Sequence, residues 1–106
     1  MRIVFDLDGT LCTDTKGEYE QAKPLLDRIA KVNSHYDAGD QVIIMTARGM
    51  GRTGNNASLA RKLFEELTKN QLSQWGVKHH QLVLGKPSAD IYVDDKGARD
   101  VDFFKD

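Results

Sequence analysis

Ile3-Val4-Phe5-Asp6-Leu7-Asp8-Gly9-Thr10 is the part of the chain that indicates its architecture most directly. The first three residues are apolar and two of them are β-branched, which favours a strand that is buried on both faces of a parallel sheet. The sequence then changes abruptly to two aspartates, a glycine and a threonine. Polar residues at this position are typical of α/β domains, in which ligands bind at the carboxyl ends of the strands.

The rest of the chain alternates between short apolar runs and longer amphipathic stretches. Further strands are predicted at residues 42–45, 82–84 and 91–93, and a helix is expected after Pro24, ending near Gly39. Three glycines between residues 47 and 56 indicate a loop, and a long helix should follow it and stop at Gly76. Its inward face is expected to carry Leu59, Leu63, Leu67 and Trp75.

This alternation predicts an α/β fold, namely a three-layer, Rossmann-like parallel sheet of about four strands with helices on both faces. A brief helix is expected near residues 103–104. With 106 residues there is room for one domain only, so residues 1–106 are treated as a single unit.

Composition excludes several classes of protein. The formal net charge of -1 gives no overall attraction to nucleic acid or to anionic lipid, and no apolar run approaches the roughly 20 residues that a membrane span needs. An aspartate at position 6 comes too early for a secretory signal, and the single cysteine, Cys12, cannot form an internal disulfide. A cytoplasmic protein without a membrane partner is expected.

Four carboxylates follow two of the predicted strands, with Asp6 and Asp8 after the first and Asp94 and Asp95 after the last. If they gather at one edge of the sheet, they repel one another unless protons or a cation neutralise them. Mg²⁺ suits such a site because it prefers oxygen ligands and uses only one or two carboxylates. The alternative is that these aspartates only cap helices or form turns.

The order of these residues resembles the haloacid dehalogenase-like (HAD) superfamily. Asp6-Leu7-Asp8-Gly9-Thr10 is similar to its first motif, and Thr46, Lys86 and the pair Asp94-Asp95 stand where its later motifs are expected. The resemblance spans residues 1 to about 97, and it implies a magnesium-dependent phosphatase.

The resemblance also implies a role for each of these residues. Asp6 would attack phosphorus and form an aspartyl-phosphate, and Asp8 would act as general acid and then as general base. Thr46 would donate a hydrogen bond to a phosphoryl oxygen, and Lys86 would balance charge. The magnesium ion would be held by Asp6, by the main-chain carbonyl of Asp8, and by Asp94 or Asp95, a choice that the sequence leaves open.

Three residues near Thr46 are candidates for substrate binding. Arg48 is suited to phosphate oxygens, although a structural salt bridge is an equal alternative. Gly49 and Arg52 belong to the same glycine-containing loop. By contrast, His79 and His80 have no neighbours with the spacing of a transition-metal site.

Spacing also bears on the substrate. Only about 15 residues separate Asp8 from the helix after Pro24, which allows a short flap but no inserted cap domain. Residues 46–56 and 85–96 resemble small phosphatases of bacterial capsule or surface-polysaccharide synthesis, which implies a small phosphorylated metabolite such as a sugar or polyol phosphate. A sheet with an exposed edge would also allow a homo-oligomer.

Two rival functions remain. One is a nucleic-acid 3′-end phosphatase, which the lack of net positive charge and of any basic-aromatic stripe in the sequence disfavours. The other, from a different class, is a phosphoryl-accepting receiver domain, but receivers carry their acidic pair before the phosphorylated aspartate along the chain. An inactive, binding-only relative is a third possibility, disfavoured because each catalytic position is filled.

Overall fold

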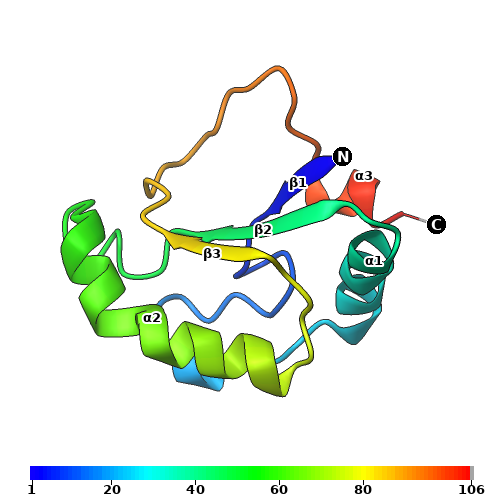
Figure 1. The fold of residues 1–106 in the computed structure, drawn as a ribbon. Helices are drawn as coiled ribbons and strands as arrows, with labels where there is room; N and C mark the ends of the chain where they lie inside the picture. The colour runs from blue at the N-terminus through cyan, green and yellow to red at the C-terminus, as the bar shows by residue number, and fades with distance from the viewer. Residues whose placement is uncertain (106) are drawn as a thin grey trace.

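The computed structural model describes residues 1–105 as one α/β unit built on a small parallel sheet (Figure 1). The strands are β1 (Arg2–Phe5), β2 (Gln41–Thr46) and β3 (Gln81–Leu84). The helices are α1 (Leu26–Asp37), α2 (Ala57–Gln74) and α3 (Asp100–Phe103), with a 3₁₀ turn, η1, at Tyr19–Gln21. No helix in this part of the chain is both long and apolar enough to cross a bilayer.

The three strands are parallel in the order β1-β2-β3, with Phe5 beside Ile44 and Thr46 beside Leu84. Because parallel neighbours run in the same direction, their carboxyl ends meet at one edge of the sheet. The loops after Phe5, Thr46 and Leu84 therefore lie near one another. Asp6, Asp8, Arg48 and Lys86 lie in these loops, and Thr46 is the last residue of β2.

One face of the sheet carries the core. Register places Ile3, Phe5, Val42 and Ile44 on this face, where they join side chains from both long helices. Ile29 and Val32 come from α1, and Leu72 from α2. Val4, on the opposite face, is 55% exposed. The predicted three-layer arrangement with helices on both faces is therefore not confirmed.

The predicted fourth strand is wrong. Residues 85–99 form no regular strand, and in Figure 1 they arch away from the sheet before reaching α3. Ile91 and Val93 are 76% and 93% exposed. An apolar run of three residues satisfies the sequence pattern of a strand, but a strand also needs a paired neighbour, and here none is in place.

The C-terminal aromatic residues pack against β1. Phe103 packs edge-on against Phe5 with ring centroids 5.5 Å apart, and Phe104 lies 6.1 Å from the same ring. Arg28 of α1 adds an ion pair to Asp100, with Nη1 2.7 Å from the carboxylate oxygen. These contacts hold α3 against β1 and α1.

Helix α2 shows a second difference from expectation. Leu59 and Leu63 are 41% and 52% exposed, so these two predicted inward positions are wrong, whereas Trp75 packs against the core. The buried positions are instead Ala60, Thr68, Gln71 and Leu72, with Asn56 as the N-cap, whose side chain accepts a hydrogen bond from the Leu59 N–H. Two of these inward residues are polar, because they meet a buried arginine from the loop after β2.

Candidate functional site

Six of the predicted site residues surround one pocket at the carboxyl ends of the strands. Its volume is about 520 Å³. The predicted members are Asp6, Asp8, Thr46, Arg48, Arg52 and Lys86, and the pocket is also lined by Asp14, Lys16, Gly17, Tyr19, Ala47, Gly51, Ser88, Ala89 and Tyr92. It contains four cationic and three carboxylate side chains, which leaves an excess of one positive charge suited to an anion.

Asp6 follows β1 directly and is held from two sides. The Thr10 hydroxyl donates to Oδ2 at 3.3 Å, and Lys86 Nζ lies 3.5 Å from Oδ1. The side chain is still 36% exposed, so a ligand can reach it. Gly9, at φ 81°, lets the chain turn sharply enough to bring Thr10 back to Asp6.

Lys86 reaches Asp6 from the loop after β3. Its ammonium group lies 4.3 Å from the centroid of the Tyr92 ring, a cation–π contact that keeps the side chain beside the pocket. The Tyr92 hydroxyl donates to the Pro87 carbonyl and holds the ring. Lys86 is thus fixed within reach of both Asp6 and an anion in front of it.

Asp8 is bound to Arg48 through both carboxylate oxygens. Arg48 Nε donates to Oδ2 at 2.9 Å and Nη2 donates to Oδ1 at 3.0 Å. Cys12 Sγ lies 3.4 Å from Oδ1 as a weak donor. Burial, together with the negative charge of Asp8, raises the pKa of the Cys12 thiol to about 12, so this group stays protonated.

Arg48 is wholly buried and makes only internal contacts. Besides Asp8, its Nη1 donates to the Thr68 hydroxyl at 3.2 Å and to the Gln71 side-chain oxygen, while Nη2 also approaches Cys12. The Tyr19 ring lies 4.9 Å from the guanidinium carbon. A guanidinium has five N–H groups, and here all five meet acceptors. Arg48 was predicted either to bind substrate or to form a structural salt bridge, and the geometry favours the salt bridge.

Thr46 and Gly49 also have internal partners. Thr46 Oγ1 accepts from the Arg48 main-chain N–H at 3.1 Å and lies at the wall of the pocket. The Gly49 N–H donates to the Tyr19 hydroxyl at 2.9 Å. Gly49 is buried and does not line the pocket, so the structure does not bring it to a substrate.

Arg52 joins the glycine-containing loop to the segment that precedes α1. Its Nη2 donates to the Gly17 carbonyl at 2.9 Å, and its guanidinium lies 5.0 Å from the Phe64 ring centroid. Asp14, Lys16 and Tyr19 of that segment line the pocket. Residues 13–23 thus form the short flap that the spacing predicted, and the sequence carried no signal that its side chains reach the site.

Asp94 and Asp95 lie apart from this pocket. Both are exposed, and neither lines it. Asp94 accepts from the Lys96 N–H at 2.9 Å, and this hydrogen bond is the main reason that the pKa of Asp94 is lowered. Within residues 1–105 no three His, Cys, Asp or Glu side chains are placed to hold a metal ion together. The predicted set of Asp6, Asp8, Asp94 and Asp95 is not assembled, because residues 91–93 do not join the sheet.

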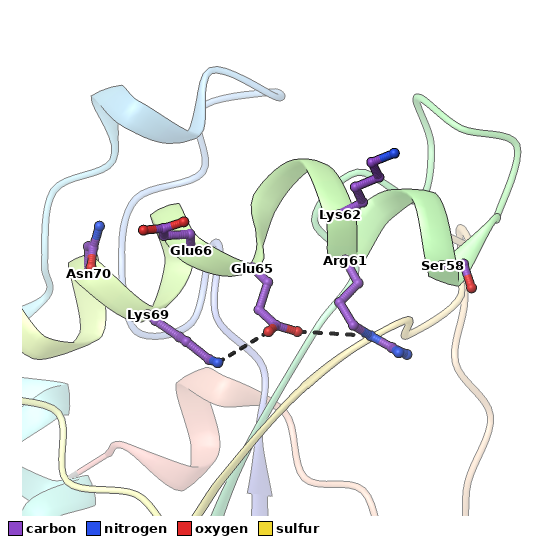
Figure 2. A pocket seen from close by; sticks show the side chains of 7 residues that line it. All are labelled: Ser58, Arg61, Lys62, Glu65, Glu66, Lys69 and Asn70. Atoms are coloured by element: carbon purple, nitrogen blue, oxygen red, sulfur yellow. Dashed lines mark hydrogen bonds and ion pairs between the residues drawn. The ribbon is translucent and has the colours of Figure 1, made fainter.

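A second hollow, of about 670 Å³, lies on the outer face of α2 (Figure 2). Glu65 there pairs with Lys69 at 3.1 Å and with Arg61 at 4.0 Å, one helical turn to either side. Such pairs are common on solvated helices and contribute little to stability. Although this hollow is larger, it gathers no buried or strand-end polar groups, so the pocket at Asp6 is the better candidate.

Comparison with known proteins identifies a similar fold but no family. No family model matches the chain, and no curated protein matches it. A crystal structure of an MCSG target from Vibrio cholerae is similar, with 26% sequence identity and a TM-score of 0.90. The match covers 98% of this chain and 87% of that one. The likeness supports the compact α/β architecture over the matched 98% of the chain.

Proposed function

We propose that this chain is a phosphomonoester hydrolase of the HAD type that uses Asp6 as its nucleophile. The observation that carries the proposal is the setting of Asp6, which lies at the end of β1 between the Thr10 hydroxyl and Lys86 and faces the pocket. A carboxylate that is fixed, accessible and beside a cation can attack the phosphorus of a bound monoester.

The charges around Asp6 support an anionic substrate. Lys16, Arg52 and Lys86 line the pocket, and Asp8 is already paired with Arg48. A phosphoryl group spreads its negative charge over three oxygens, so cations on different sides of the pocket can stabilise it during transfer. A small sugar or polyol phosphate of surface-polysaccharide synthesis remains the proposed substrate, and a reducing, cytoplasmic setting the proposed location.

The proposed reaction has two steps. Asp6 forms a bond to phosphorus while the bond to the ester oxygen breaks, and the leaving oxygen takes a proton from Asp8. Water then attacks the aspartyl-phosphate, its proton passes to Asp8, and the bond between phosphorus and Asp6 breaks. Asp6 is regenerated and phosphate is released.

Magnesium dependence is part of the proposal because the resemblance implies it. The donor set of the described residues does not fit a magnesium ion, since Asp94 and Asp95 do not line the pocket and no three His, Cys, Asp or Glu side chains among residues 1–105 are placed to hold a metal. The proposed steps use only side chains of the protein and water. The dependence of the rate on magnesium is measured by comparing turnover of the purified protein in EDTA with turnover after Mg²⁺ is added.

The test of the proposed function is the variant Asp6→Asn. It removes the nucleophilic charge while keeping the size of the side chain, so hydrolysis of p-nitrophenyl phosphate should fall by at least about 10³-fold. The circular dichroism spectrum and the melting temperature should stay close to those of the wild type. Asp14→Asn, which changes another carboxylate at the pocket, is the matched control, and its kcat should fall much less. Equal turnover by the Asp6 variant and the wild type would exclude Asp6 as the nucleophile.

A screen of phosphorylated metabolites, ranked by kcat/KM, would then identify the substrate. Sugar and polyol phosphates should rank above oligonucleotides with a 3′-phosphate. The opposite ranking would favour the nucleic-acid alternative.

A further inference from the structure

We infer that Arg48 is a positioning residue that holds Asp8 in one orientation and leaves a single carboxylate oxygen, Oδ2, to exchange the catalytic proton. The inference rests on the proposed function, because it assigns a partner to the general acid–base of that reaction. It replaces the expectation that Arg48 binds substrate.

Arg48 and Asp8 form a pair with defined geometry. Arg48 meets Asp8 through Nε at 2.9 Å and Nη2 at 3.0 Å, a two-point contact that fixes both the position and the plane of the carboxylate. A single lysine could supply the charge but not this orientation, because its ammonium group acts as a point charge. Asp8 therefore cannot rotate freely while the pair is intact.

Arg48 itself is held in place by its surroundings. Its guanidinium is fully buried, and Thr68 and Gln71 of α2 accept from Nη1. The Tyr19 ring covers the guanidinium, and Gln71 Nε2 donates to the Tyr19 carbonyl. The orientation of Asp8 is thus set by Thr68 and Gln71 of α2 and by Tyr19 of the flap.

The two oxygens of Asp8 differ in their hydrogen-bond partners. Each carboxylate oxygen has about two lone-pair sites. Oδ1 accepts from Arg48 Nη2 at 3.0 Å and, more weakly, from Cys12 Sγ at 3.4 Å, so its sites are taken. Oδ2 accepts only from Arg48 Nε among the described residues. One site on Oδ2 is therefore left for the proton that passes to the leaving oxygen and returns from water.

The test compares kcat and KM for p-nitrophenyl phosphate in Arg48→Met, Arg48→Lys, Asp8→Asn and the double variant Asp8→Asn/Arg48→Met. Loss of Arg48 should lower kcat by about 10²-fold, the lower range for general acid–base catalysis, while KM stays within about threefold. Arg48→Lys should also fall short of the wild type, and added guanidinium should raise the rate of Arg48→Met. Arg61→Met, an exposed arginine on α2, is the matched control and should match the wild type.

The double variant separates a positioning role from a merely structural one. If Arg48 acts through Asp8, its loss in the Asp8→Asn background should cost nothing further, within about threefold. Losses that multiply in the double variant would overturn the inference, and so would a rise in KM with kcat unchanged, which would indicate substrate binding. A folded Arg48→Met variant with wild-type kcat would overturn it as well.

One further variant keeps the test valid if Arg48→Met misfolds. If Arg48→Met does not give a folded protein, Thr68→Val removes one hydrogen bond to Arg48 at nearly constant volume and should lower kcat severalfold with KM unchanged. The Asp6→Asn result distinguishes the two proposals. If Asp6→Asn keeps its activity, both the proposed function and the inference are rejected. If Asp6→Asn is inactive but Thr68→Val and Arg48→Lys keep the wild-type kcat, only the inference is rejected.

Discussion

Replacement of Gly49 by alanine should destabilise the fold, and the structure shows both physical reasons for the loss of stability. Gly49 lies at φ +79°, a left-handed conformation that costs an L-residue about 1–2 kcal/mol. A Cβ built there would lie 2.7 Å and 2.9 Å from two ring carbons of Phe64 and 3.1 Å from the Ala60 Cβ. Because overpacking of this kind costs about 1–3 kcal/mol, Gly49→Ala should lower the free energy of unfolding by about 2–5 kcal/mol.

Gly54 provides the matched control. It lies in the same loop at φ +67°, but a Cβ there would meet nothing within 4 Å. Gly54→Ala should therefore show the backbone cost alone, about 1–2 kcal/mol. Urea denaturation followed by circular dichroism measures both variants, and the difference in midpoint should appear with an unchanged m-value. Losses of stability that agree within about 0.5 kcal/mol would refute the clash with Phe64.

Two further predictions concern single titratable groups. Arg28 lowers the pKa of Asp100, so the stabilisation from this pair is present above the ordinary carboxyl pKa and is lost as pH falls through the lowered one. Asp100→Asn should thus reduce the melting temperature slightly at neutral pH, and a difference that persists unchanged in acid would contradict this. Cys12 is fully buried with a pKa of about 12, so iodoacetamide at pH 8 should label it far more slowly in the native protein than in urea, as mass spectrometry would record. Rapid labelling of the native protein would show that the thiol is accessible.

The sequence predicted the parts of the fold that depend on local pattern. The β-branched run at residues 3–5 and the run at 42–45 became neighbouring parallel strands, and the helix-stop glycines stand near the ends of α1 and α2. The gathering of Asp6, Thr46 and Lys86 was also predictable, because it follows from parallel strands whose polar ends share one edge.

What the sequence did not predict depends on contacts between distant segments. Residues 91–93 have the composition of a strand, yet nothing in their pattern indicates whether a neighbour will pair with them. The inward face of α2 was misplaced because a buried arginine selects polar partners, and Thr68 and Gln71 look like surface residues when the helix is considered alone. Tyr19 was missed for the same reason, since its contacts with Arg48 and Gly49 cross about 30 positions of the chain.

The parallel pairing of the strands also determines when the pocket can exist. Arg2 lies beside Gln41 and Ile43 beside Gln81, so each pairing closes a long loop and requires an entire helix to be in place. No fragment that lacks one of the three strands can bring Asp6, Thr46 and Lys86 together. The proposed phosphate site therefore requires all three strands to be paired, and binding of a phosphate analogue would report that pairing.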